Sequence, residues 1–282
     1  MKQQKLGISV GKFFTTPVAE LARAIKDAGF FAVSPAWTKD DRTANFISEA
    51  RKNNLVLQSL HAPGAPADKL WYTDTEISAP ALAELCQCVD DCAAWEIPIM
   101  VVHSSQHFDT SRVPTEAGFQ NFTALVDYAA SKNVRIAFEN MEREMFIFAL
   151  MEHFWNHPNV GFCWDSGHEM CYNHSIPMLE HFGQRLIMTH INDNFGIRSA
   201  DGQIRAGDDL HLLPFDGTGN WQLHVERLRA AQKVEILNFE IKPASWPGQH
   251  ENDPYAQMPL QDFLAEVYAR GQKIADAYFL DV

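Results

Sequence analysis

The chain has 282 residues, of which 46% are hydrophobic and 11% aromatic, so it can bury a full hydrophobic core. It carries 23 basic and 36 acidic residues, a net charge of −13. This charge opposes binding to nucleic acid, because affinity for nucleic acid comes mostly from basic groups that neutralise phosphates. We therefore expect no nucleic-acid partner, although net charge does not describe any one local face.

The sequence also argues against a membrane or secreted protein. No stretch approaches the roughly 18 consecutive apolar residues that a membrane span needs. Residues 1–5 lead into a short apolar run broken by Gly7 and Lys12, which is not a secretory signal. The five cysteines show no disulfide framework and are expected to be small buried side chains in a reducing compartment. We expect a cytoplasmic enzyme without a membrane partner.

Short apolar runs alternate with helical patterns along the whole chain. The predicted strands cover residues 6–10, 30–34, 56–60, 99–102, 134–138, 160–164, 186–189 and 234–239. The predicted helices cover residues 17–28, 42–52, 79–95, 115–131, 145–155, 177–182, 221–231 and 260–277. Pro17 in the first turn and Gly29 just past the last turn mark the ends of the first helix.

This alternation predicts an α/β fold with a parallel sheet. Eight strand–helix units in a chain of this length favour a (β/α)8 barrel, a TIM barrel of eight parallel strands. The alternative is an open doubly wound sheet, but no Gly-x-Gly-x-x-Gly follows the first strand. Since composition does not change between the two halves, we expect residues 1–282 to form a single domain.

The ends of the predicted strands carry the chemistry. In a (β/α)8 barrel the active site lies at the carboxyl ends of the strands. Strands three to eight end on His61, His103, Glu139, Asp165, His190 and Glu240. A lone histidine there is usually a hydrogen-bonded structural residue, and Asp165 alone could simply cap the next helix, with His168 merely nearby. Six such residues at consecutive strand ends are not explained in that way.

The same six positions predict a metal site. Carboxylates at buried strand ends need compensation, because desolvating an unpaired charge is costly. Few Lys or Arg residues occupy matching positions, so a divalent cation is the natural partner. Mixed carboxylate and imidazole ligands suit Mn, Co, Zn or Fe better than thiolate ligands would, and Mg is also open.

Several motifs carry a family resemblance that covers the chain from Leu6 to about Ala277. They are Asp165-x-x-His168, His190-Ile-Asn-Asp, Asp209-x-His211 followed by Gly217-x-Gly219, and the terminal Phe-Glu240. The sequence resembles the sugar phosphate isomerase/epimerase branch of the xylose isomerase-like TIM barrels. That group also includes the zinc-dependent endonuclease IV enzymes.

The resemblance implies roles for individual residues. In the sugar enzymes, the positions matching Glu139, Asp165, His190 and Glu240 bind one divalent metal. The matches to Glu139 and Glu240 also act as the acid/base pair, and the match to His168 contacts the substrate. The resemblance also implies a homo-oligomer, because dimers and tetramers are common in the family.

The nuclease branch implies more metal ions. There His61, His103 and Glu139 would form one zinc site, and Glu139, Asp165, His190 and Glu240 a second. His168, Asp209 and His211 would form a third. All of these ligand types are present, so His61, His103, His168, Asp209 and His211 are candidates either for substrate binding or for a second or third metal.

Loop residues supply further candidates for substrate binding. Five aromatic residues fall in loops after predicted strands and could stack on a sugar, although ordinary packing is an equal alternative: Phe13, Phe14, Trp37, Trp71 and Trp246. Arg198 and Arg205 could hold a phosphate, but a solvated loop position is the more usual one for each.

The leading hypothesis is a divalent-metal-dependent isomerase or epimerase acting on a ketose or a related polyol-derived carbonyl compound. A two-glutamate acid/base pair, Glu139 and Glu240, would act on an enediolate that the metal stabilises. An endonuclease IV-like zinc phosphodiesterase acting on DNA is one alternative, which the charge of −13 disfavours. A non-catalytic sugar-binding relative is another, which would not need both glutamates.

Overall fold

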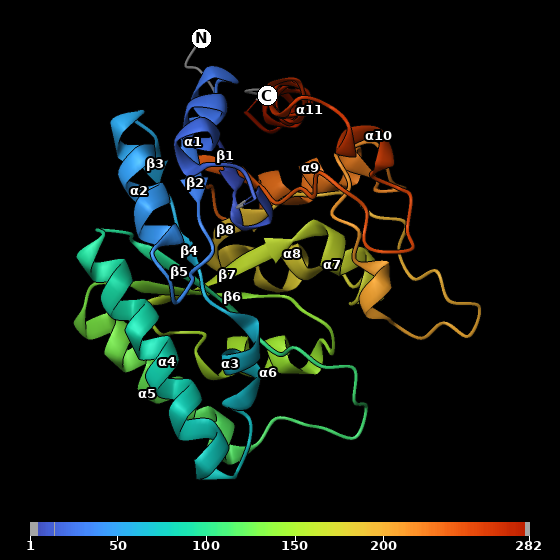
Figure 1. Ribbon diagram of the computed structural model, residues 1–282. Helices are drawn as coiled ribbons and strands as arrows, with labels where there is room; N and C mark the ends of the chain where they lie inside the picture. Colours follow the sequence, from blue (N-terminus) through green and yellow to red (C-terminus); the bar gives the residue numbers. More distant parts are fainter. Residues whose placement is uncertain (1–4, 14, 280–282) are drawn as a thin grey trace.

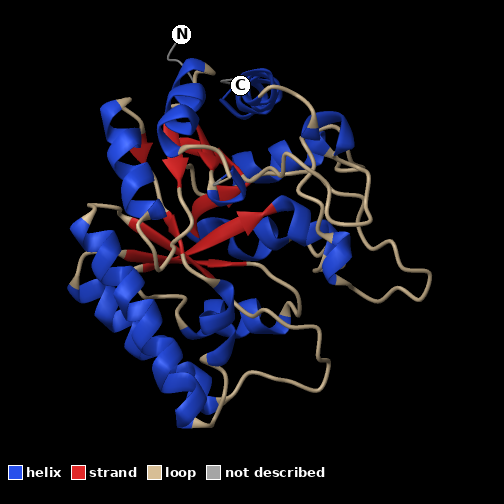
Figure 2. Cartoon of the chain, viewed as in Figure 1, coloured by secondary structure: helices blue, strands red, loops and turns tan. Residues whose placement is uncertain are grey.

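A computed structural model describes residues 5–13 and 15–279, and its centre is a ring of parallel strands surrounded by helices (Figure 2). The strands are β1 (Lys5–Ser9), β2 (Ala32–Ser34), β3 (Val56–Leu57), β4 (Leu60–His61), β5 (Ile99–His103), β6 (Arg135–Glu139), β7 (Val160–Asp165), β8 (Leu186–His190) and β9 (Ile236–Phe239). Every ladder between these strands is parallel. The α/β fold with a parallel sheet is therefore confirmed.

The strands form two sheets that join into a barrel. The sheet orders are β3-β2-β1-β9 and β4-β5-β6-β7-β8. Single parallel bridges link them at both junctions, Ala36 to His61 and Ile191 to Phe239. The predicted strand 56–60 is broken at Gln58 and Ser59, so its two halves, β3 and β4, belong to different sheets. The barrel thus keeps eight strand positions, as predicted.

Helices cover the outside of the barrel (Figure 1). They are α1 (Val18–Asp27), α2 (Arg42–Lys52), α3 (Gly64–Lys69), α4 (Thr75–Ala94), α5 (Glu116–Ser131), α6 (Met145–His153), α7 (Ser166–Cys171), α8 (Met178–Phe182), α9 (Trp221–Ala230), α10 (Asp253–Ala256) and α11 (Leu260–Phe279). The sequence missed α3, α7 and α10, because helices of four to six residues show no clear helical period. The last helix, α11, packs against α1 and α9 and completes the ring.

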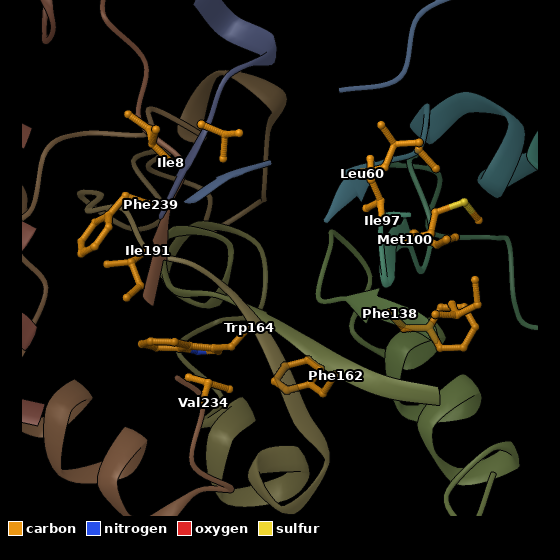
Figure 3. Close-up of a cluster of buried hydrophobic side chains, with 14 of the residues drawn as sticks. Ile8, Leu60, Ile97, Met100, Phe138, Phe162, Trp164, Ile191, Val234 and Phe239 are labelled. Atoms are coloured by element: carbon orange, nitrogen blue, oxygen red, sulfur yellow. The ribbon is translucent and has the colours of Figure 1, made fainter. Parts of the chain in front are cut away.

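The alternation of side chains along each strand separates the packed core from the barrel interior. On β6, Ile136 and Phe138 pack outward into the main hydrophobic core, part of which Figure 3 shows. Ala137 instead lies inside the barrel with Val101 and Cys163. Glu139 follows Ala137 by two residues, so its side chain emerges from the interior face at the carboxyl end of the strand.

Two further expectations can be compared with the fold. In the described part of the chain, no helix is both long enough and apolar enough to cross a membrane. None of the five cysteines forms a disulfide, and all except the half-buried Cys86 are buried.

Candidate active site

Four side chains from different strands meet at the carboxyl end of the barrel. His61 ends β4, Glu139 ends β6, His190 ends β8, and Glu240 directly follows β9. One ligand atom from each lies within 4.8 Å of the others. His190 Nδ1 is 2.9 Å from Glu139 Oε1 and 2.8 Å from Glu240 Oε2, and His61 Nε2 is 3.2 Å from Glu139 Oε2. We call these four residues the strand-end cluster.

The electrostatics of the strand-end cluster favour charged groups despite complete burial of Glu139 and His190. Burial alone would raise the pKa of Glu139, but the charge and hydrogen bond of His190 and a hydrogen bond from His61 lower it well below its usual value. Burial alone would lower the pKa of His190, but Cys163, Glu139 and Glu240 raise it well above its usual value. The cluster therefore presents an ionised carboxylate to whatever binds there.

His103 stands behind this cluster. Its Nε2 atom is 3.6 Å from Glu139 Oε2, and its ring meets the His61 ring edge to face at 4.9 Å between centroids. Burial lowers the pKa of His103 to about 3, so its imidazole is neutral at pH 7. A neutral imidazole retains a lone pair that can serve as a metal ligand.

Three more side chains form a second group, which we call the loop cluster. His168 lies on α7, whereas Asp209 and His211 lie in the long connection between β8 and α9. Asp209 Oδ2 is 2.9 Å from His211 Nε2 and 3.6 Å from His168 Nε2. Burial would raise the pKa of Asp209, but His211 and His168 lower it well below its usual value.

His168 also faces the strand-end cluster. Its Nδ1 atom lies 3.0 Å from the carbonyl oxygen of Asn140 and 3.5 Å from Glu139 Oε1. Burial would lower the pKa of His168, but Asp165 and Asp209 raise it to about 10. The two clusters are therefore adjacent, with His168 between them.

Asp165 lies beside the strand-end cluster. The sequence grouped it with Glu139, His190 and Glu240, and its carboxylate lies within 4.8 Å of ligand atoms of both Glu139 and Glu240. It groups with Glu139 and His168 on one side and with His211 and Glu240 on the other. Burial raises its pKa. Asp165 is thus a bridge between the two clusters.

Asp165 also caps a helix, so the two interpretations of this residue are compatible. Its Oδ1 atom accepts a hydrogen bond of 2.7 Å from the backbone N–H of His168 at the start of α7. The side chain of Asn192 donates to both of its oxygens, at 3.1 and 3.0 Å. These bonds fix the carboxylate in the barrel mouth.

Two aromatic residues predicted to bind substrate are committed to packing. Trp71 is only 2% exposed, and its indole N–H donates to the carbonyl of Ser104 while its ring packs against Phe122. It therefore belongs to the core beneath α5, because a short unpredicted helix, α3, turns it inward. Trp37 is half-buried and donates its indole N–H to Asp91 of α4 at 2.7 Å.

The remaining aromatic candidates differ from one another in their exposure. Phe13 is buried against Phe263, and Phe14 lies outside the described residues. Trp246 is 41% exposed, and its indole N–H donates to the carbonyl of Asp209, so it lies beside the loop cluster.

The two arginines proposed to hold a phosphate pair within their own connection or with a neighbouring loop. Arg198 pairs with Asp208 and Glu251 and donates to the carbonyl of Gly207. Arg205 pairs with Asp201. Arg198 therefore braces the connection against the next loop, because two carboxylates already neutralise its guanidinium.

Two residues that shape the site had no role assigned from the sequence. Tyr172 stacks on the His168 ring, with centroids 5.1 Å apart, and its position four residues later, directly after α7, explains the contact. It was missed because α7 itself was missed. Asn192 was visible within the His190-Ile-Asn-Asp motif, but nothing in the sequence indicated that its amide would hold Asp165.

The donor set of the two clusters fits a divalent cation. Among the described residues, only histidines form ion pairs with Glu139, Asp165 and Asp209. Two buried atoms, Asp209 Oδ1 and His190 Nε2, have no hydrogen-bond partner there. Buried carboxylates facing imidazoles are the ligands of Zn²⁺ and related transition metals.

A barrel with acidic and imidazole side chains at its carboxyl rim defines the class, and comparison with known proteins gives the family. The chain belongs to the xylose isomerase-like TIM barrel family, whose model matches residues 22–263. A relative, the uncharacterized protein y4fM of Sinorhizobium fredii, is 35% identical over 164 residues, which are 54% of this chain and 50% of y4fM. The chain thus spans about half the length of the curated relative it matches.

Solved structures share the fold. The crystal structure of the IolI protein with a bound zinc atom has a TM-score of 0.78 at 16% identity, covering 99% of this chain and 100% of IolI. D-psicose 3-epimerase with D-tagatose from Clostridium cellulolyticum H10 has a TM-score of 0.72 at 13% identity, covering 98% and 99% of the two chains. At these identities the likeness shows the barrel fold.

Proposed function

We propose that this protein is a divalent-metal-dependent isomerase or epimerase acting on a ketose or a related sugar-derived carbonyl compound. The observation that carries the proposal is the pair of glutamates on either side of one imidazole. Glu139 and Glu240 come from separate strands, yet both carboxylates approach His190 Nδ1 within 2.9 Å. The sugar epimerases that share the barrel fold support the substrate class.

Glu139, Asp165, His190 and Glu240 would hold the cation, with His61 as a further nitrogen ligand. When bound, a divalent cation polarises a carbonyl oxygen as a Lewis acid and orients neighbouring hydroxyl oxygens. This chain's own part is to keep the Glu139 carboxylate ionised inside a closed barrel. The histidines around Glu139 do this by lowering its pKa.

Glu139 and Glu240 would carry the protons. One carboxylate removes the proton from the carbon next to the substrate carbonyl, and the other returns a proton to the opposite face or to the neighbouring carbon. Positioned proton transfer of this kind contributes about 10²–10⁴-fold in rate. Exclusion of water from the buried cluster strengthens these interactions.

The loop cluster would bind the rest of the substrate. His168, Asp209 and His211 supply donors and an acceptor beside the acid/base pair, and Trp246, which is 41% exposed, lies next to them with Lys242 Nζ 2.7 Å from the centre of its ring. A second or third cation could instead use these residues together with His61 and His103. Counting the bound metal ions distinguishes the two arrangements.

The test is solvent exchange on a panel of ketoses. Incubation in deuterated water should place deuterium at the carbon next to the carbonyl of one substrate. The Glu240→Gln variant should keep the fold and much of the metal while losing this exchange. A wild-type protein that exchanges no ketose, or a Glu240→Gln variant that exchanges normally, contradicts the proposal.

A zinc phosphodiesterase acting on DNA is the second candidate, and the loop cluster favours it. His168, Asp209 and His211 form a complete ligand group separate from the strand-end cluster, which suits more than one ion. Three tightly held zinc ions per chain, together with cleavage of duplex DNA, would establish this function. The net charge of −13 disfavours it, because phosphate contacts need basic groups.

A further inference from the structure

Part of the motif His190-Ile-Asn-Asp193 has no place in the proposed chemistry. Asp193 lies just beyond β8 and is completely buried. Among the described residues, no Lys, Arg or His side chain forms an ion pair with it within 4 Å. A buried carboxylate without a cationic partner must be stabilised by hydrogen bonds.

The carboxylate of Asp193 accepts four hydrogen bonds, three from the connection between β8 and α9 and one from Trp221 at the start of α9. Oδ1 accepts from the backbone N–H of Asn194 at 2.8 Å and of Gly219 at 3.0 Å. Oδ2 accepts from the backbone N–H of Phe215 and from the indole N–H of Trp221, both at 2.9 Å. One side chain thus fixes the far end of the connection between β8 and α9.

The backbone of Asp193 holds the near end of the same segment. Its N–H donates to the carbonyl of Leu212 at 2.8 Å, and its carbonyl accepts from the N–H of Leu212 at 3.0 Å. Leu212 directly follows His211, a member of the loop cluster. Two backbone hydrogen bonds between Asp193 and Leu212 therefore hold the neighbouring His211 close to the end of β8.

The glycines of Gly217-x-Gly219 allow the loop to lie this close to the Asp193 carboxylate. A Cβ atom at Gly217 would lie 2.3 Å from both the carbonyl oxygen of Asn194 and Oδ1 of Asp193. At Gly219 it would lie 2.8 Å from the same Oδ1 atom. Only residues without a side chain let the loop approach this closely.

We propose that Asp193 is the positioning residue that holds the loop cluster against the strand-end cluster. Its substrate-binding consequence rests on the proposed function, because that function has the loop cluster contact the substrate. Asp193 contacts neither the substrate nor the cation. It sets where Asp209 and His211 stand relative to His190.

The kinetic test compares Asp193→Ala and Asp193→Asn with the wild type. Asp193→Ala should raise KM for the exchanged ketose about tenfold or more, with a smaller change in kcat. Its affinity for Mn²⁺ titrated alone should stay within about threefold, because the strand-end cluster is unchanged. Asp193→Asn retains one side-chain oxygen, so its KM should lie between those of the wild type and Asp193→Ala. Unchanged KM in a folded Asp193→Ala protein overturns the proposal.

Asp216→Asn is the matched control. Asp216 lies in the same connection, but it pairs with Arg270 and Tyr255 near α10 and α11. This variant should lower the melting temperature without changing KM or Mn²⁺ affinity. If Asp216→Asn raises KM as much as Asp193→Ala does, the positioning is not a property of Asp193, and the proposal is wrong.

A second measurement does not depend on metal or turnover. The rings of His168 and His211 lie edge to face, with centroids 5.8 Å apart. In the metal-free protein, nuclear Overhauser contacts between these rings should be present in the wild type and in Asp216→Asn, and absent in Asp193→Ala. If they persist in Asp193→Ala, the positioning proposal fails. If they behave as expected but no ketose exchanges deuterium, only the proposed function fails.

Discussion

The two clusters at the barrel mouth are built in different ways. The strand-end cluster takes its residues from β4, β6, β8 and the end of β9, where parallel ladders fix each position. The loop cluster takes one residue from α7, a six-residue helix, and two from a long connection. The difference teaches that one site can combine ligands held by backbone pairing with ligands held by side-chain tethers.

Backbone pairing makes the strand-end cluster the more rigid of the two. Glu139 pairs with Cys163 across β6 and β7, and Asp165 pairs with His190 across β7 and β8. These pairings fix the backbone from which each of these side chains extends. The loop cluster lies outside these ladders and is held by loop contacts, among them the bonds of Asp193 and the Lys242 backbone N–H that donates to the carbonyl of His211, so its geometry is the easier one to alter.

The largest effect is expected for Glu139→Ala, because this carboxylate touches four imidazoles: those of His61, His103, His168 and His190. Cation affinity should fall by about 100-fold or more, since even residues behind metal ligands contribute 10–100-fold. Turnover should fall by about 10²–10⁴-fold. Titration with Mn²⁺ and the deuterium-exchange assay measure the two losses.

Glu169→Gln is the control for this variant. Glu169 is also a buried glutamate, but it accepts hydrogen bonds from Trp164 and from the backbone of Met178, outside both clusters. Its affinity for Mn²⁺ should match that of the wild type. Equal losses in the two variants would mean that burial of a glutamate, rather than the strand-end cluster, governs binding.

Metal removal should separate the clusters next. At a cation concentration 100 times Kd, binding stabilises a folded protein by about 2.7 kcal/mol. Chelation should therefore lower the melting temperature of the wild type. His190→Ala should be insensitive to the chelator, whereas His211→Ala should keep most of the wild-type response. A wild-type melting temperature that ignores the chelator would contradict the assignment of the cation to the strand-end cluster.

His211→Ala should have a smaller effect on catalysis, and one of a different kind. A hydrogen bond to a charged group contributes about 1.5–3 kcal/mol, which corresponds to about tenfold or more in KM. The value of kcat should change less than KM, because the proposed acid/base pair, Glu139 and Glu240, is intact. The steady-state constants decide this, and a fall in kcat with KM unchanged would place His211 among the reacting groups instead.

The smallest effect is a pH dependence of stability in the metal-free protein. The carboxylates of Asp165 and Asp209 overcome burial and raise the pKa of His168 to about 10, from an ordinary value of 6.5. The stabilisation from protonated His168 is therefore complete below pH 6.5 and is lost as the pH rises through 10. Urea unfolding between pH 7 and 10 should show this decline, and His168→Gln should flatten it. A variant with the wild-type slope would exclude His168 as its source.

Much of this architecture could be read from local patterns. Apolar runs ending on His, Asp or Glu predicted both the strands and the residues at their ends, and Glu139, His190 and Glu240 do meet. Register explains this success, because parallel strands bring their carboxyl ends to one rim. A period of two also placed Glu139 on the same face as Ala137, inside the barrel.

The failures share a physical cause, which is that loop and short-helix geometry depends on distant partners. Trp71 was a candidate to stack on a substrate, with ordinary packing an equal alternative, and the structure packs it in the core beneath α5. Arg198 was a candidate to hold a phosphate, with a solvated loop position the more usual one, and the structure pairs it with Asp208 and Glu251. Asn192 and the start of α7 hold the carboxylate of Asp165 between the two clusters, and no sequence pattern predicted those partners.

The sequence by itself determined the barrel, the alternation of its eight strand positions with the longer helices, and the acidic and imidazole residues at the rim. The hydrophobic period and the residue types at strand ends depend only on neighbours in the sequence, so they can be recognised without the fold. Only the tertiary structure decided which of those residues share a cluster. It also decided that Asp193 forms hydrogen bonds with the connection between β8 and α9. Those contacts join residues that are far apart in sequence, and no spacing encodes the hydrogen bonds that hold them.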